Sequence, residues 1–315
     1  MSSTSCDDAP FRFELAVSAW TPDTSEEGIA SLADAGATAM EPGPSFLLDQ
    51  GPDEVAAAAQ RYRSAGIRIY SCHAPFEGPA ELAQADPAGR ARAIDMHARA
   101  IRAAAAAGAS VLVAHSSLPC PAQGPETAAR RDGLRAALEA LIGHTERAGV
   151  ALALENLLPG RIGSEGEDLR AIVDGFDSPH LGVCLDTGHA HVTNGGLPAV
   201  FQAVRGRIIN FHLHDNDRHA DKHLQPPYGS IDWEPFIAQL RQLRPAHPLT
   251  VEAPPWDNAG HAVQLREVRA LFAGGRAAVT DGGRDFHLTC PRCRRYVFVA
   301  GDETFCGCSR APAGN

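Results

Sequence analysis

The sequence predicts an α/β protein folded as a (β/α)8 barrel, followed by a small cysteine-rich C-terminal module. Eight apolar segments of strand length alternate with eight segments of helical character over most of the 315 residues. Several of these helical segments end at a glycine directly before the next strand, and His, Asp and Glu side chains collect at the strand ends. The length suffices for one large domain and a short appendage.

The predicted elements alternate regularly along the chain. Strands are expected at residues 13–20, 37–41, 67–73, 110–115, 150–156, 181–186, 207–215 and 249–252. Helices are expected at residues 25–35, 53–65, 87–107, 125–148, 165–176, 197–204, 233–243 and 260–272. Gly36, Gly66, Gly108 and Gly149 each precede a strand, as glycines that end helices do. A doubly wound sheet would need a Gly-rich phosphate turn after its first strand, which SAWTPDTS lacks.

Three regions are predicted: a barrel over residues 11–273, a Gly-rich linker over 274–286, and a zinc-ribbon-like module over 287–309. In the module, Cys290 and Cys293 precede the hairpin-like segment YVFVAGDETF, and Cys306 and Cys308 follow it. Four thiolates at this spacing would form a structural zinc site. The alternative is a partly disordered tail that carries free thiols.

Composition limits the partners and the compartment. The net charge of −10 opposes binding to a polyanion, so nucleic acid is not expected as a partner. No apolar run approaches the roughly 20 residues of a membrane span, and the acidic first residues do not resemble a signal peptide. Singly scattered cysteines indicate a reducing compartment, so we expect a cytoplasmic protein. The oligomeric state stays open, a homo-oligomer included.

Four ionisable side chains end four different predicted strands: Glu155, Asp186, His212 and Glu252. In a parallel barrel these ends meet at the mouth where active sites lie. A glutamate that follows an apolar run such as ALAL or LTV is costly to bury unless it is paired or binds a metal. We therefore predict a divalent-metal site there, with a set of structural ion pairs as the alternative.

Further candidates surround these four. His73 and His115 end adjacent strands, and His189 lies three residues after Asp186, across a Thr-Gly pair predicted to turn the chain sharply. His214 alternates with His212 on one side of a strand, so either could be the ligand. The remaining candidates are Asp221, His223 and Arg218, in a long loop before residue 233, and Glu41, at the end of the second strand. The alternatives are core histidines, exposed loop histidines and a Glu41–Arg pair.

The segments HAPF, LENL, LDTGHAHV, HLHDN and DKHLQPPYGSIDW resemble the xylose isomerase-like TIM-barrel superfamily over about residues 11 to 273. This superfamily groups sugar and sugar-phosphate isomerases and epimerases with endonuclease IV. The resemblance to ketose 3-epimerases implies one divalent cation (Mn, Co, Mg or Zn) held by Glu155, Asp186, His212 and Glu252. It also implies that Glu155 and Glu252 are the acid–base pair, and that His189 and Arg218 contact the substrate. His73 and His115 are further candidates for substrate contact.

Endonuclease IV is similar in a different way, because that family binds three zinc ions with five His, two Asp and two Glu. All nine have counterparts here: His73, His115, Glu155, Asp186, His189, His212, Asp221, His223 and Glu252. Isomerase-like barrels also carry a loop similar to DxHLPPGxG after the seventh strand. Here this loop is DKHLQPPYGSID, with Pro-Tyr where Gly-Glu is usual. The ligand match therefore does not by itself imply DNA repair.

We therefore expect a metal-dependent isomerase or epimerase that acts on a sugar or sugar phosphate through an enediolate. The alternatives are a multi-zinc phosphoesterase, a metal-dependent sugar lyase or deglycosidase, and a non-catalytic sensor.

Overall fold

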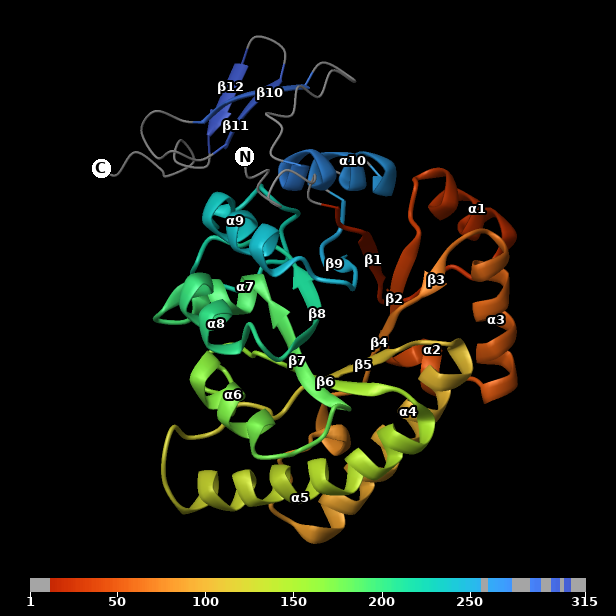
Figure 1. The fold of residues 1–315 in the computed structure, drawn as a ribbon, viewed down its shortest axis with the longest axis vertical. Helices are drawn as coiled ribbons and strands as arrows, with labels where there is room; N and C mark the ends of the chain where they lie inside the picture. Colours follow the sequence, from red (N-terminus) through yellow and green to blue (C-terminus); the bar gives the residue numbers. More distant parts are fainter. Residues whose placement is uncertain (1–11, 256–259, 274–283, 290–295, 301–302, 307–315) are drawn as a thin grey trace, which may run out of the picture.

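The computed structural model describes residues 12–255, 260–273, 284–289, 296–300 and 303–306. One parallel sheet runs in the order β3-β2-β1-β9-β8-β7-β6-β5-β4. Its strands are β1 (Leu15–Ala19), β2 (Ala39–Pro42), β3 (Arg68–Ile69), β4 (Ser71–His73), β5 (Val111–Ala114), β6 (Ala151–Glu155), β7 (Leu181–Asp186), β8 (Ile208–Leu213) and β9 (Leu249–Val251). Figure 1 shows these strands gathered around one axis.

The strands β3 and β4 are two halves of one predicted strand, separated only at Tyr70. The first half pairs with β2 and the second with β5, so this segment joins the two ends of the sheet. Eight strand positions therefore make up the barrel, and the predicted (β/α)8 fold is confirmed.

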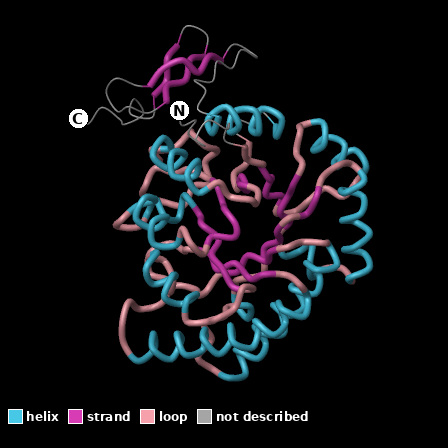
Figure 2. The backbone as a smooth tube through the Cα atoms, in the orientation of Figure 1, coloured by secondary structure: helices cyan, strands magenta, loops and turns pink. Residues whose placement is uncertain are grey.

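Helices surround the strands on the outside, as Figure 2 shows. The eight predicted helices are α1 (Glu26–Asp34), α3 (Pro52–Ser64), α4 (Pro87–Ala107), α5 (Pro125–Ala148), α6 (Gly166–Asp174), α8 (Gly196–Val204), α9 (Trp233–Leu243) and α10 (Gly260–Ala273). Three short elements were not predicted: α2 (Pro44–Leu48), η1 (Gly78–Ala80) and α7 (Thr187–Val192). They are too short to produce a hydrophobic period that the sequence could reveal.

The strands separate two apolar cores. Leu112, Leu152 and Phe211 are buried in the large core between sheet and helices. A smaller cluster of Val111, Val113, Ala153 and Cys184 is separate from it, as expected for the barrel interior. Side chains alternate along a strand, so residues two positions after the small cluster also point inward. His115, Glu155 and Asp186 occupy these positions, which places their polar groups at the barrel mouth.

The C-terminal region contains a second sheet of three antiparallel strands, β10 (Arg284–Thr289), β11 (Tyr296–Ala300) and β12 (Glu303–Cys306). The last residues of the predicted linker thus belong to a strand. Cys290, Cys293 and Cys308 lie outside the described residues, so the structural zinc site stays a prediction. In the described part of the chain, no helix is long and apolar enough to cross a membrane.

Candidate metal centre

The four strand-end ligands predicted as the metal set converge at the barrel mouth. Asp186 and His212 are register partners on β7 and β8. The Nδ1 atom of His212 lies 3.0 Å from Glu252 Oε2, 3.3 Å from Glu155 Oε1 and 3.9 Å from Asp186 Oδ2. One ligand atom from each of the four lies within 4.8 Å of the others. We call these four residues the central group.

A second group shares Glu155 with the central group. His115 Nε2 and His73 Nε2 lie 3.0 and 3.5 Å from Glu155 Oε2, on the other oxygen of this carboxylate. Because one oxygen faces His212 and the other faces two more imidazoles, Glu155 has the geometry of a bridging carboxylate. We call His73, His115 and Glu155 the β4–β5 group.

A third group joins the end of β7 to the long loop after β8. It consists of His189, His214, Asp221 and His223, and we call it the loop group. His189 Nε2 and His223 Nε2 each lie 3.2 Å from Asp221 Oδ2, and His214 Nε2 lies 3.7 Å from Asp221 Oδ1. The sequence left the choice between His212 and His214 open. The structure brings His212 into the central group and His214 into the loop group. His214 Nε2 also lies 2.9 Å from Asp186 Oδ1.

The prediction of a sharp turn between Asp186 and His189 is wrong, because the chain continues there as helix α7. Asp186 caps this helix by accepting a hydrogen bond of 2.7 Å from the backbone N–H of His189. Gly188 is required here, since a Cβ atom on it would lie 1.9 Å from His214 Cε1. The helix therefore brings His189 to the mouth while the glycine makes room for His214.

The loop over residues 214–232 is held in place by Asp215. Its backbone pairs with Leu224, and its buried carboxylate accepts hydrogen bonds from the N–H groups of Asn216 and Ile231 and from Trp233 Nε1. His223 takes a left-handed φ of 43°, and its Nδ1 lies 2.9 Å from the carbonyl oxygen of Glu252. The loop thus presents the side chain of His223 to the mouth of the barrel.

Glu41 was expected either to line the cavity or to pair with an arginine, but it does neither. It is 1% exposed and lies 2.8 Å from His212 Nε2, on the side of the ring opposite the central group. Ser71 Oγ and Asn210 Nδ2 donate to its second oxygen. Glu41 is therefore placed to accept the Nε2 proton of His212, which leaves Nδ1 free to bind a metal.

Opposite charges balance one another across these groups. Burial raises the pKa of Glu155, but the neighbouring imidazoles, His212 first, outweigh burial and hold it well below its usual value. Burial lowers the pKa of His212, but Cys184 and the surrounding carboxylates raise it well above the usual value. The pKa of His189 is also well above the usual value, because Asp186, Asp221 and Glu155 outweigh burial. These raised pKa values favour the protonated imidazoles in the metal-free site, so a bound cation competes with protons there.

The donor atoms suit a divalent metal. Four buried polar atoms of these groups take part in no hydrogen bond of suitable geometry: Glu155 Oε2, Glu252 Oε2, Asp221 Oδ1 and His214 Nδ1. The first three face an imidazole nitrogen only as ion-pair contacts, at 3.0–3.7 Å. Such atoms cost free energy unless something pairs with them. Imidazole nitrogens and carboxylate oxygens are the usual ligands of Zn²⁺ and also bind Mn²⁺ and Co²⁺. The residues present therefore fit a divalent ion, although its identity and number stay predictions.

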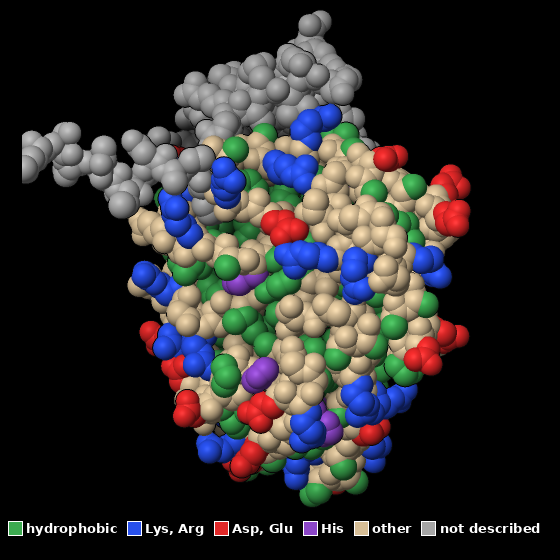
Figure 3. Space-filling model, turned by 45° about the vertical axis from the view of Figure 1, so that its right-hand side comes forward, with side chains coloured by type: hydrophobic (Ala, Val, Ile, Leu, Met, Phe, Trp, Pro, Cys, Tyr) green, Lys and Arg blue, Asp and Glu red, His purple; other side chains and the backbone are tan. Residues whose placement is uncertain are grey.

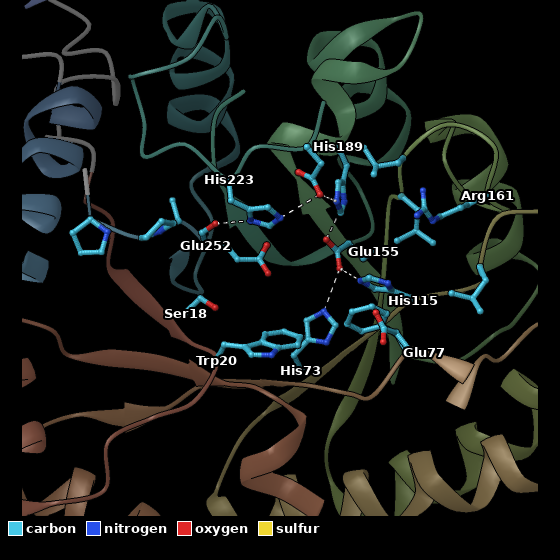
Figure 4. A pocket seen from close by; sticks show the side chains of 18 of the residues that line it. Ser18, Trp20, His73, Glu77, His115, Glu155, Arg161, His189, His223 and Glu252 are labelled. Atoms are coloured by element: carbon cyan, nitrogen blue, oxygen red, sulfur yellow. Dashed lines mark hydrogen bonds and ion pairs between the residues drawn. The ribbon is translucent and has the colours of Figure 1, made fainter. Parts of the chain in front are cut away.

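The three groups open into one cavity of about 700 Å³. Its wall includes Trp20, which is 45% exposed, and Phe76, which stacks on His115 at 4.1 Å between ring centroids. Figure 4 shows His73, His115, Glu155, His189, His223 and Glu252 around this cavity.

The arginine predicted to contact substrate, Arg218, is exposed and does not line the cavity, so its role stays a prediction. Arg161, on the loop after β6, lines the cavity instead. One signal in the sequence could have found it, because Arg161 is the single charged residue among apolar residues and glycines in LLPGRIG.

The fold and this site define a (β/α)8 barrel with a candidate metal centre at its mouth. Residues 29–269 match the family described as "Xylose isomerase-like TIM barrel". The match covers well over half of the chain, so the chain belongs to this family, as its sequence resemblance predicted.

Two curated relatives, both uncharacterised proteins, are similar in sequence. One from Methanocaldococcus jannaschii is 31% identical over 137 residues, 42% of this chain and 45% of that protein. One from Sinorhizobium fredii is 28% identical over 145 residues, 43% of this chain and 47% of that protein. The chain thus spans less than half the length of either relative.

Solved structures extend the likeness to nearly whole chains. A D-tagatose 3-epimerase-like protein superimposes with a TM-score of 0.69 at 23% identity, covering 82% of this chain and 96% of that one. The 3-keto-D-glucoside 4-epimerase of E. coli gives 0.70 at 16% identity, covering 82% and 100%. The IolI protein with a bound zinc atom gives 0.67 at 17% identity, covering 82% and 96%. At these identities the likeness shows the fold alone.

Proposed function

We propose that the protein is a divalent-metal-dependent isomerase or epimerase of a sugar or sugar phosphate. The observation that carries the proposal is the placement of Glu155 and Glu252 close to His212 Nδ1, at 3.3 and 3.0 Å, within one four-ligand group. Both carboxylates also line the cavity, whose volume suits a monosaccharide. Solved structures of the same fold include proteins named as sugar epimerases, which agrees with this chemistry.

The residues have complementary roles in this reaction. One carboxylate, Glu155 or Glu252, removes the proton from the carbon next to the substrate carbonyl, and the other returns a proton to a different carbon or to the opposite face. A divalent ion held by the central group would polarise the carbonyl and the adjacent hydroxyl. His189 is proposed to orient substrate hydroxyls, and Trp20 and Phe76 supply apolar surface for the sugar ring.

Product formation tests the proposal. The full-length chain, loaded in turn with Mn²⁺, Co²⁺, Mg²⁺ or Zn²⁺, is incubated with a panel of ketoses, aldoses and their phosphates, and products are separated by chromatography. We expect an epimer or isomer to accumulate with at least one metal, and Glu252→Gln to abolish its formation while the fold is retained. Full turnover by Glu252→Gln would show that the carboxylate assignment is wrong.

A second candidate is a multi-zinc phosphoester hydrolase, which the β4–β5 group and the loop group favour. Both supply further ligand sets beside the central group, and Glu155 is placed to bridge two of them. A nucleic-acid substrate is not favoured, since basic side chains on the face seen in Figure 3 are scattered among acidic ones rather than gathered in one block. Two or three zinc ions per barrel, together with cleavage of a phosphoester such as abasic DNA and no sugar conversion, would favour the hydrolase.

A further inference from the structure

One side chain of the cavity has no role in the reaction described above. Arg161 comes from the loop between β6 and α6, is half-buried and lines the same cavity. Figure 4 shows it at the edge of the cavity beyond His115, away from Ser18 and Glu252. Among the described residues that line the cavity, Arg161 is the one permanently charged cation.

The backbone around Arg161 is fixed on both sides. The N–H of Cys120 donates to the carbonyl of Gly160 at 2.9 Å, and the N–H of Ile162 donates to Ser117 Oγ at 2.9 Å. Ile162 is 2% exposed and anchors the loop in the core. Because these contacts restrain the chain, the guanidinium is held near the cavity at a smaller entropy cost than on a free loop.

The guanidinium of Arg161 forms no hydrogen bond or ion pair with any residue that the structure describes. Two arginines of the neighbouring helix α5 are paired: Arg131 contacts both oxygens of Asp168 at 2.8 and 2.9 Å, and Arg130 contacts Glu81. Lys222, in the loop after β8, is paired with Asp217 at 2.5 Å. Arg161 therefore keeps its full set of donors available to a molecule in the cavity.

We propose that Arg161 recognises an anionic group, a phosphate or a carboxylate, on the part of the substrate remote from the reacting carbon. The planar guanidinium donates two parallel hydrogen bonds to either group, and these charge-assisted bonds are about twice as strong as neutral ones. This inference rests on the proposed function for the reacting end of the substrate. It narrows the substrate class to sugar phosphates or sugar acids.

Equilibrium binding tests this role without requiring turnover. The Mn²⁺-loaded full-length chain is titrated by calorimetry with D-fructose, D-fructose 6-phosphate and D-fructuronate. Carbon 6 of these ketoses carries a hydroxyl group, carries a phosphate group or is a carboxylate carbon, respectively. The variants are Arg161→Gln, which removes the charge, and Arg161→Lys, which keeps the charge but loses the two-donor geometry. Arg99→Gln is the matched control, because Arg99 is exposed on α4 and does not line the cavity.

For the wild type and Arg99→Gln, we expect one charged ketose to bind at least about tenfold more tightly than fructose. Arg161→Gln should lose this preference, and Arg161→Lys should keep only part of it. Preference for the phosphate or for the carboxylate identifies the source of the charge. The proposal is overturned if neither charged ketose is preferred, or if the preference survives in Arg161→Gln, as it would if the metal alone held the anion. Absence of isomerisation would contradict the proposed function but leave this binding difference unaffected.

Discussion

Replacing Glu41 by glutamine should weaken metal binding although this residue lies outside the cavity. Glu41 lies 2.8 Å from His212 Nε2, with Ser71 and Asn210 donating to its other oxygen. A glutamine has one acceptor oxygen, so it cannot serve all three donors. If its amide nitrogen faces His212, the ring must move its proton to Nδ1, the atom that faces the central group.

The magnitude follows from this contact. Loss of a partner that orients a metal-binding histidine typically lowers metal affinity by about 10–100-fold, or about 1.4–2.7 kcal/mol. Leaving one buried donor unpaired costs a further 1–3 kcal/mol, roughly, in the free energy of unfolding of the metal-free protein. Competition with a fluorescent chelator measures the metal affinity, and urea denaturation measures the free energy of unfolding.

Ser71→Ala is the matched control for Glu41→Gln. It removes one donor to Glu41 but leaves the contact with His212 intact. We expect metal affinity in this control to change by less than the change caused by Glu41→Gln. Unchanged Mn²⁺ and Zn²⁺ affinities in Glu41→Gln would refute the idea that Glu41 sets the proton position of His212.

Further predictions concern pH, metal number and the C-terminal cysteines. In the metal-free protein, burial lowers the pKa of His223, but Asp221 and Glu252 outweigh burial and raise this pKa to about 9. The stability that protonated His223 contributes is therefore present below pH 6.5 and is lost as the pH rises toward 9. Burial raises the pKa of Glu252, but His212 outweighs burial and lowers this pKa to about 2. The stability that ionised Glu252 contributes is therefore present above pH 4.5 and is lost as the pH falls toward 2. The Tm of the metal-free protein should therefore be highest between these two limits, and a steady rise from pH 6.5 to 9 would argue against these charge pairs. Elemental analysis should show that Glu252→Ala loses the tightly bound barrel metal while His223→Ala retains it; the reverse would make the loop group the stronger site. Cys290→Ser with Cys293→Ser should remove one zinc ion per chain without changing barrel activity, and equal zinc content would exclude a structural zinc held by these thiols.

Long, regular elements could be predicted almost to the residue. The predicted helices at 87–107 and 125–148 coincide with α4 and α5 because each begins at a proline and ends before a glycine in the left-handed conformation. The strand at 181–186 coincides with β7. Proline and glycine act locally, so their effect on helix ends does not depend on the rest of the fold.

Short elements and contacts through space could not be predicted in this way. Helix α7 was missed because Thr-Gly after Asp186 is typical of a turn, whereas the carboxylate of Asp186 caps a helix. The four members of the central group could be predicted to meet because parallel strand ends converge at one mouth. The contact between Glu41 and His212, 171 positions apart, and the position of Arg161 depend on loop and barrel geometry that no local pattern contains.

The central claim is that Glu155 and Glu252 move a proton at the carbon next to a sugar carbonyl. The most direct test is the conversion, in D₂O, of a sugar that the metal-loaded protein accepts, followed by NMR of the product. We expect one solvent deuterium in the wild-type product, at the carbon that receives the returned proton, and no exchange with Glu252→Gln. A product formed without solvent deuterium, or exchange that persists in Glu252→Gln, would contradict it.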